Sequence, residues 1–468
     1  MKENDDPINV LDTGYKKLIE PYEAEALETL RRYIAIDSVN DQSTVTKEAP
    51  FGAGVAKALD FIAEVGGKLG FSVDRCDGYC TELTYGEGDK VFDVYAHCDV
   101  VPVERENWAH DPFALTIEGN SMYGRGTSDD KGPGLACLYA IKALMDAGKI
   151  HGYRLRYIVG GDEERGSACL NYYFEVLRKG YPTYGISPDS DFPCDYAEKS
   201  IYFYQADYED TFIDVDDFEA GNVLNIVLAH AKCRLRSHVE EAKALIPFYI
   251  EEHPGVGIEL DGDVLKVDGK PYHGSLPWLG VNAGLHLINF LGELFNNRKL
   301  IAIYKTYETG KCEIIGGNYT DSDFEASSYN VGKVIYHEGT LSLQVNLRYP
   351  VTYAVDEVIN NLKAKTTGKI TIINGSEGIK FDPHSDFINI LLSSYREETG
   401  DYESKPQAIG GGTYARESKN SVAYGCMFPG RDYRMHGDDE FFPLTDFYAA
   451  MQVYAHAMDK ISDFMRSL

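Results

Sequence analysis

The sequence predicts an α/β fold, a mixed and mostly parallel sheet with flanking helices, into which an α+β domain is inserted. Over residues 1–199, β-rich runs alternate with helix-length patterns, whereas strand patterns of alternating hydrophobicity dominate residues 200–383. The last segment, residues 384–468, returns to helical spacing. We therefore expect residues 1–199 and 384–468 to form one domain and residues 200–383 to form a second domain inserted in it.

The first expected elements follow from the spacing of apolar residues. Three-to-four spacing predicts helices, and a β-rich run that leads directly into His97 predicts a strand. A further helix is ended by Gly148 and is followed by another strand, so this stretch is typical of a βαβ crossover. The expected ranges, in chain order, are helices 21–36 and 51–69, strand 91–96, helix 134–147 and strand 153–159.

The later elements are a short strand at 184–187 and two strong helices within 387–468, around a Gly-rich stretch. In the middle of the chain, residues 201–207 and 340–348 have the β-rich and alternating patterns of an antiparallel sheet.

Charge and cysteine usage limit the possible functions. The chain carries 74 acidic and 45 basic residues, a formal charge of −29, so it would repel nucleic acids and anionic membranes. The first residues, 1–12, lack the pattern of a secretory leader, and no apolar run approaches the roughly 20 residues of a membrane span. Nine scattered cysteines without a CxxC pair suit reduced thiols. We expect a cytoplasmic enzyme acting on a small molecule or peptide.

Acidic residues follow the ends of the predicted strands. His97 and Asp99 follow one strand, Glu163 and Glu164 follow the next, and Asp189 follows the short strand. Ligand sites of parallel α/β sheets lie at the carboxyl ends of strands, so these side chains are expected to converge. Asp99 is placed to accept a hydrogen bond from His97. A His-x-Asp pair alone is more typical of a buried histidine bonded to its neighbour.

Two more motifs complete the set of candidate ligands. The segment GRGTSDDKGP, residues 124–133, carries two carboxylates before a helix, and His436 lies in the late motif MHGDDE. Each alone is typical of a cap or a turn. Together the motifs supply two imidazoles and at least three carboxylates, a ligand mix that suits paired zinc or manganese ions ~3.5–4 Å apart. Cys98 faces away from His97 by strand alternation, which indicates packing.

The order of these motifs carries a resemblance to a known family. YAHCDVVP, GRGTSDDKGP, GGDEERGS, SPDSDFP and the late histidine resemble the M20 family of metallopeptidases over nearly the whole chain. With SPDSDFP and GGGTYAR, the chain resembles the PepV-like dipeptidase branch of this family, the branch of Xaa-His dipeptidases and carnosinase-like enzymes. The resemblance implies a zinc-peptidase-like catalytic domain with a lid domain inserted in it.

The resemblance also implies an activity and a set of roles. The activity is metal-dependent hydrolysis of dipeptides with a free C-terminal carboxylate, by a hydroxide that bridges two divalent ions, with a glutamate as general base. The ions are Zn²⁺ first, with Mn²⁺ or Co²⁺ as alternatives. The implied roles are Asp129 as the bridging ligand, His97 and Asp189 on one ion, Glu164 and His436 on the other, Glu163 as the general base, and Asp99 holding His97.

For the lid, the resemblance implies groups that contact the substrate. His273 would polarise the scissile carbonyl, and Asn225 and Arg348 would meet the oxyanion and the α-carboxylate. Thr413 and the backbone N–H groups of Gly411 and Gly412 would meet the same carboxylate. Gly274 stands where alanine is common in the family, and we expect this change to be neutral. The role of Glu440, in the late motif, stays open.

Two alternative functions fit the same residues. One is an N-acyl amino-acid deacylase of the succinyl-diaminopimelate desuccinylase or acetylornithine deacetylase type, which uses the same metal core. The other is a catalytically silent metal-binding or scaffold protein on this fold. The expected partner is a dipeptide, with no nucleic acid and no membrane. A monomer is favoured over a homodimer, because the inserted region is long enough to supply His273 in cis.

Overall fold

The computed structural model describes residues 7–468, which form two compact units. Unit 1 comprises the chain up to Ala197 together with Ile379–Ala408 and Thr413–Leu468. Unit 2 comprises Glu198–Gly378 and Ile409–Gly412. Residues 1–6, which begin the segment inspected for a leader, lie outside the described residues.

Unit 1 contains a nine-stranded sheet of mixed direction, in the order β1-β2-β6-β3-β7-β20-β9-β18 with β19 paired to β9. The four central strands, β6, β3, β7 and β20, run parallel, and antiparallel strands flank them. The predicted α/β fold with a mixed sheet and flanking helices is confirmed, and the parallel strands are confined to the centre of the sheet. The bounds are β1 Ser72–Asp74, β2 Cys80–Tyr85, β3 Val91–His97, β6 Arg154–Gly160, β7 Tyr184–Ser187, β9 Asp195–Glu198, β18 Ile379–Lys380, β19 Gln407–Ile409 and β20 Ser421–Ala423.

A buried ion pair joins two residues that lie opposite each other in the pairing of β3 and β6. Asp93 lies opposite Arg156, whose Nε and Nη2 donate to the two carboxylate oxygens at 2.7 and 2.6 Å. A slip of one residue would separate this buried pair and turn each strand's side chains to the other face. The observed register puts His97 opposite Gly160, so the loops that follow both strands leave the sheet at one edge.

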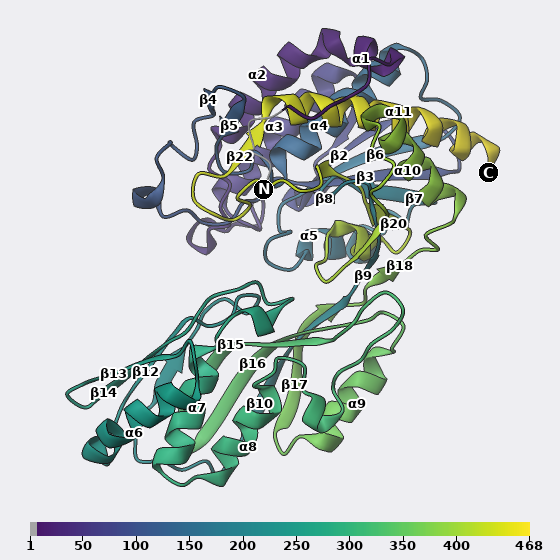
Figure 1. Ribbon diagram of the computed structural model, residues 1–468. Coiled ribbons are helices and arrows are strands. Elements are labelled where there is room, and N and C mark those ends of the chain that lie inside the picture. The colour runs from purple at the N-terminus through teal and green to yellow at the C-terminus, as the bar shows by residue number, and fades with distance from the viewer. Residues whose placement is uncertain (1–6) are drawn as a thin grey trace. The chain divides into compact units, whose positions relative to one another are not determined.

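The helices of unit 1 cover this sheet, and α4 and α11 lie side by side along it (Figure 1). Helix α4 begins at Lys131, three residues before the predicted start, because Pro133 is tolerated in the first turn, where backbone N–H groups lack partners anyway. Gly134 packs closely, since a Cβ there would lie 2.9 Å from the Tyr157 hydroxyl. The bounds are α1 Gly14–Ile19, α2 Glu23–Ile34, α3 Ala53–Leu69, α4 Lys131–Asp146, α5 Ala168–Asn171, α10 Asp386–Thr399 and α11 Leu444–Ser467.

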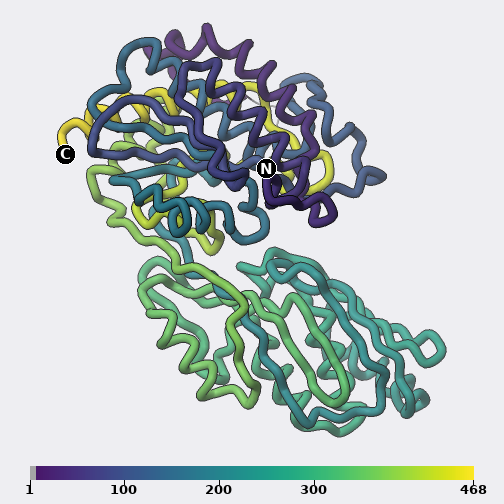
Figure 2. The backbone as a smooth tube through the Cα atoms, turned by 180° about the vertical axis from the view of Figure 1, so that it is seen from behind, coloured from purple at the N-terminus to yellow at the C-terminus, as the bar shows by residue number. Residues whose placement is uncertain are grey.

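The N-terminal segment and the C-terminal helix pack against one another in unit 1. Figure 2 shows the N-terminal segment, in purple, against the C-terminal helix, in yellow. Gln452 of α11 donates to the carbonyl of Leu11 at 2.8 Å. Unit 1 also holds two small sheets, with strands β4 Thr116–Glu118, β5 Ser121–Tyr123 and β22 Phe441–Pro443 in one, and β8 Ser190–Asp191 and β21 Cys426–Met427 in the other.

Unit 2 is an α+β unit with its own hydrophobic core. Its five-stranded antiparallel sheet has the order β11-β15-β16-β10-β17, and a three-stranded sheet has the order β12-β14-β13. The strands are β10 Ser200–Tyr208, β11 Phe218–Ala220, β12 His230–Arg234, β13 Gly257–Asp261, β14 Val264–Asp268, β15 Ser328–His337, β16 Thr340–Tyr349 and β17 Lys369–Ser376. The helices are α6 Val239–Glu252, α7 Ala283–Leu294, α8 Arg298–Tyr307 and α9 Val355–Lys365.

All nine cysteines are buried free thiols, as the scattered pattern indicated. Among the described residues, the longest apolar stretches of helix fall short of what a membrane crossing requires.

Stability of unit 2 should depend on the protonation of His286. Burial, together with the neighbouring His253, lowers the pKa of His286 to about 4. Between pH 6.5 and 4 the unfolded chain binds a proton there and the folded chain does not, so stability is lost as the pH falls, by up to about 3 kcal/mol. The melting temperature of metal-free His286→Asn should therefore fall less steeply with acidification than that of the wild type.

The matched control for this experiment is His238→Asn, at an exposed histidine of the same unit. Its melting curve should keep the wild-type pH slope. An unchanged slope in His286→Asn as well would show that the buried imidazole contributes nothing to acid unfolding.

Candidate metal centre

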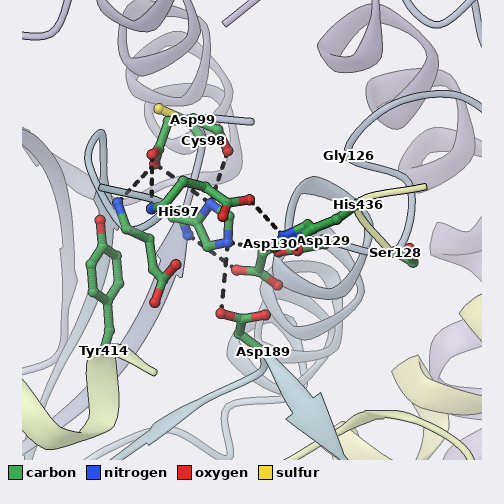
Figure 3. A network of polar contacts seen from close by, with 12 residues as sticks. His97, Cys98, Asp99, Gly126, Ser128, Asp129, Asp130, Asp189, Tyr414 and His436 are labelled. Atoms are coloured by element: carbon green, nitrogen blue, oxygen red, sulfur yellow. Dashed lines mark hydrogen bonds and ion pairs between the residues drawn. The ribbon is translucent and has the colours of Figure 1, made fainter. Parts of the chain in front are cut away.

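Side chains from distant parts of unit 1 converge beyond the ends of its central strands, and Figure 3 shows His97, Asp129, Asp189 and His436 among them. His97 ends β3, and Asp189 lies two residues beyond β7. Glu164 follows β6, Asp129 precedes α4, and His436 lies in the loop between β21 and β22. Parallel strands direct their following loops to one edge, which is why residues so far apart in the sequence meet here.

Asp129 lies between the two histidines. Its Oδ1 is 2.9 Å from Nε2 of His97, and its Oδ2 is 2.7 Å from Nε2 of His436. Each carboxylate oxygen therefore faces a different imidazole, the arrangement that a carboxylate shared by two cations requires. The peptide bond that follows, between Asp129 and Asp130, is cis.

The other predicted ligands divide between the two histidines. Oδ2 of Asp189 lies 3.6 Å from Nε2 of His97, and Oε1 of Glu164 lies 3.1 Å from Nε2 of His436. Ligand atoms of His97, Asp129 and Glu164 all lie within 4.8 Å of one another, as do those of His97, Glu163 and Asp189. The cluster is compact enough for cations to contact several donors at once.

Asp99 holds the site in a different way from the one expected. Nδ1 of His97 is 2.9 Å from the main-chain oxygen of Asp99 but 3.5 Å from its carboxylate. The carboxylate instead accepts hydrogen bonds from the backbone N–H groups of Glu163 and Glu164, at 3.1 and 3.2 Å. Asp99 therefore orients His97 through its carbonyl and fixes the turn that carries both glutamates.

The protonation of the cluster reflects its buried negative charge. Burial and the charge of Asp189 raise the pKa of Glu163 well above its usual range, and burial and Asp129 raise that of Asp189 to about 7. Burial opposes protonation of His436, but Asp129 and Glu164 raise its pKa to about 12. The protonated imidazoles thus supply the positive charge that so many neighbouring carboxylates require.

These residues fit divalent metal ions. The donor set combines imidazole nitrogens with carboxylate oxygens, as zinc and manganese sites do. Metal ions bind ionised carboxylates and neutral imidazoles, so a bound ion would displace protons from these groups. Oδ1 of the buried Asp130 has no hydrogen-bond partner among the described residues, and its Oδ2 accepts from the backbone N–H of His97 at 3.1 Å. Metal binding and proton release are therefore expected to be coupled.

Glu440, whose role the sequence left open, holds the loop that carries Asp129. Its fully buried carboxylate accepts from Nη1 of Arg125 at 2.7 Å and from the backbone N–H groups of residues 126, 128 and 129 at 2.9–3.3 Å. The hydroxyl of Ser128 adds another bond at 2.9 Å. Sequence reasoning could have found this role only from the acid's place beside His436 in the late motif.

Cys98 and Tyr414 border the cluster without entering it. The sulfur of Cys98 points away from Asp129 and Asp189, as strand alternation predicted, and burial raises the pKa of its thiol (Figure 3). The ring of Tyr414 lies edge-on to His97 with centroids 6.2 Å apart, and its hydroxyl is 2.9 Å from Sγ of Cys169. Sequence reasoning missed this tyrosine.

Unit 2 brings two of its predicted substrate-binding residues side by side. An antiparallel bridge joins Ile226 to His273, and the backbone N–H of Gly274 donates to the carbonyl of Asn225 at 2.6 Å. Nδ1 of His273 lies 2.6 Å from the hydroxyl oxygen of Ser275, and the backbone N–H of Ser275 lies 3.3 Å from the same nitrogen. His273 is exposed.

Arg348 and the glycine loop also meet in unit 2. Nη1 of Arg348 donates to the carbonyl of Gly410 at 2.8 Å, directly before Gly411 and Gly412. Arg348 is 4% exposed and lies on β16. Thr413 belongs to unit 1, where its hydroxyl oxygen accepts from the N–H of Ala415 at 3.1 Å.

The expectation that Gly274 is neutral is wrong. A Cβ at this position would lie 2.7 Å from the carbonyl oxygen of Asn225 and 2.9 Å from its carbon. Both are main-chain atoms, so the Asn225 and His273 segments would have to separate. Glycine here permits the close approach of the two loops.

The chain matches the model of the family described as peptidase family M20/M25/M40 over residues 94–460. It belongs to that family. A relative from Staphylococcus haemolyticus, named "putative dipeptidase", is 32% identical over 465 residues, which cover 95% of this chain and 98% of the relative. Relatives of the same description from Staphylococcus aureus strains are 30% identical over 471 residues, with the same coverage.

Solved structures of M20 proteins share the fold. Human carnosine dipeptidase 1 superposes with a TM-score of 0.57 at 16% identity, over 96% of this chain and 98% of the other. The dipeptidase Dug1p from Saccharomyces cerevisiae superposes with a TM-score of 0.58 at 15% identity and the same coverage. At these identities the likeness concerns the fold alone.

Glu440→Gln should weaken metal binding without touching a ligand. The change removes the charge that pairs with buried Arg125 and replaces one acceptor of the loop's N–H groups, so Asp129 loses its support. Loss of a residue that orients a ligand costs about 10- to 100-fold in metal affinity. Calorimetric titration of metal-stripped protein with Zn²⁺ and Mn²⁺ measures this.

Glu82→Gln is the matched control, because Glu82 is a buried acid of unit 1 that bonds Tyr173 instead of this loop. It should bind both metals as the wild type does. Wild-type affinity in Glu440→Gln would contradict the role assigned to Glu440.

Proposed function

We propose that this protein is a metal-dependent dipeptidase that hydrolyses dipeptides with a free C-terminal carboxylate. The observation that carries the proposal is Asp129 shared between His97 and His436, with Asp189 and Glu164 beside them. Family membership and relatives named as dipeptidases support the substrate class. The proposed ligands are His97, Asp129 and Asp189 for one ion and Asp129, Glu164 and His436 for the other.

Two divalent ions, with Zn²⁺ as the first candidate, would polarise the scissile carbonyl and make water acidic enough to attack it at neutral pH. Glu163 is the proposed general base. Its backbone is held by Asp99, and burial beside Asp189 raises the pKa of its carboxyl, which favours accepting a proton from water and passing it to the leaving amine. Its neighbour Glu164 faces His436 and binds metal instead.

Unit 2 is the proposed lid, and its residues would recognise the substrate. His273 would hydrogen-bond the carbonyl oxygen as charge develops there, together with Asn225. Arg348 would pair its planar guanidinium with the α-carboxylate. Backbone N–H groups of Gly411 and Gly412, and the hydroxyl of Thr413, would complete that contact.

Turnover of a substrate panel tests the function. Metal-stripped protein reconstituted with Zn²⁺ or Mn²⁺ should hydrolyse Ala-Xaa or Xaa-His dipeptides and leave N-acetyl and N-succinyl amino acids intact. Activity confined to the acyl substrates would identify a deacylase, and no turnover with either metal would identify a silent scaffold.

Glu163→Gln should lower kcat by about 10²- to 10⁴-fold, because the amide cannot accept a proton. Its metal content should remain at the wild-type value, since the proposed ligands are intact. Glu164→Gln is the matched partner, one residue away, and should lose metal as well as activity. Elemental analysis beside steady-state kinetics separates the two, and near-wild-type kcat in Glu163→Gln would refute the general-base role.

Arg348→Lys should raise KM for dipeptides by about 10- to 100-fold, because the bidentate charged contact is lost. A dipeptide amide, which lacks the carboxylate, should be hydrolysed equally by both proteins. The ratio of kcat/KM for the two substrates is the measurement. An equal loss on the amide would place Arg348 outside carboxylate recognition.

A further inference from the structure

A buried asparagine in unit 2 holds the loop that carries Asn225. Asn330 lies on β15 and has no exposed surface. Its Nδ2 donates two hydrogen bonds, each 2.8 Å long, to the carbonyl oxygens of Leu224 and Ile226. These carbonyls belong to the residues on either side of Asn225. One side chain of the sheet therefore fixes the backbone before and after Asn225.

The Asn225 segment transmits this constraint to the His273 loop. Besides the bond from Gly274 to the carbonyl of Asn225, the N–H of Val227 donates to the carbonyl of Tyr272 at 2.8 Å. With the Ile226 to His273 bridge, the two segments form a short antiparallel pair. A shift of the Asn225 segment would therefore move His273 as well.

Arg348 is supported by the cross-strand neighbour of Asn330. In the pairing of β15 and β16, Asn330 lies opposite Asn346, whose Oδ1 accepts from Nε of Arg348 at 2.9 Å. The two asparagines thus support separate groups, the Asn225 and His273 pair on one side and Arg348 on the other. A change at Asn330 leaves the direct support of Arg348 in place.

Packing alone does not explain an amide at position 330. Oδ1 of Asn330 is buried without a hydrogen-bond partner among the described residues, an unfavourable arrangement that an apolar side chain would avoid. What the amide supplies is two donors on one nitrogen, aimed at two carbonyls. Ionised aspartate has the same shape but only acceptors, and it would repel both carbonyls.

We propose that Asn330 is a positioning residue for catalysis, one that sets Asn225 and His273 for the transition state of hydrolysis. The inference rests on the proposed function, because it assumes that these two side chains meet the developing oxyanion. It assigns to Asn330 an effect on the chemical step and none on metal binding or on anchoring the substrate carboxylate.

The test compares Asn330→Asp and Asn330→Ala with Asn289→Asp. Asn289 is a buried asparagine of α7 in the same unit, and its amide donates to Tyr249 and Glu293 instead of a loop carbonyl. Both Asn330 variants should lose about 10- to 100-fold in kcat with KM within about twofold of the wild type. The control should keep the wild-type kcat, and all proteins should keep their metal content.

Inhibition constants distinguish a positioning role of Asn330 from a merely structural one, because a merely structural role would not change them selectively. A phosphinic dipeptide analogue mimics the tetrahedral transition state, and its inhibition constant should weaken by the same factor as kcat/KM. Inhibition by the free product amino acid, which relies on the carboxylate contact, should stay unchanged. Asn330→Ser, which keeps one donor, should fall between the wild type and Asn330→Ala, and it serves if the aspartate variant does not fold.

The outcomes separate this inference from the function on which it rests. Wild-type protein that neither cleaves dipeptides nor binds the analogue would refute the proposed function. A wild type that does both, with kcat of Asn330→Ala near the wild-type value, would overturn the role of Asn330 alone. Equal losses in Asn289→Asp would also overturn it, because any buried asparagine would then have the same effect.

Discussion

The carboxylate of Asp129, which contacts both His97 and His436, is the central interaction of the candidate metal site in unit 1. Both of its oxygens face imidazoles, and Asp189 and Glu164 crowd the same space. Burial and mutual repulsion would drive these acids apart unless positive charge stood among them. Burial and neighbouring carboxylates raise the pKa of Glu163 and Asp189, and the carboxylates of Asp129 and Glu164 raise the pKa of His436. Bound divalent cations would compensate the negative charge of these carboxylates more fully than protons do.

Two further carboxylates hold the loops that carry the proposed metal ligands. Asp99 and Glu440 are both fully buried, and both direct their oxygens to backbone N–H groups of loops that carry ligands. A carboxylate can accept several such bonds, so one side chain can fix a whole turn. Acidic residues therefore have two roles in unit 1. Some carboxylates face the imidazoles of the candidate metal site, and others accept hydrogen bonds from the backbone N–H groups of the loops.

Unit 2 holds its loops with neutral groups. Asn330 supplies two donors to the Asn225 segment, and Gly274 lets that segment approach the His273 loop. In Arg348, Nε donates to the side-chain oxygen of Asn346 and Nη1 donates to the carbonyl oxygen of Gly410, and both acceptors are neutral. Neutral side chains and main-chain groups thus orient the residues that are predicted to recognise the substrate.

The sequence by itself determined the fold class and the approximate place of those helices and strands for which a range was predicted, because the spacing of apolar residues is set by the local periods of helix and strand. The order of its motifs indicated the family. It also indicated that His97, Glu163, Glu164 and Asp189 lie together, since they follow parallel strands. Only the tertiary structure assigned the carboxylate of Asp99 to the glutamate turn, Glu440 to the Asp129 loop and Asn330 to Asn225. Those contacts join residues far apart in the sequence through backbone donors and acceptors, and every residue carries such groups, so no pattern of residue types could single them out.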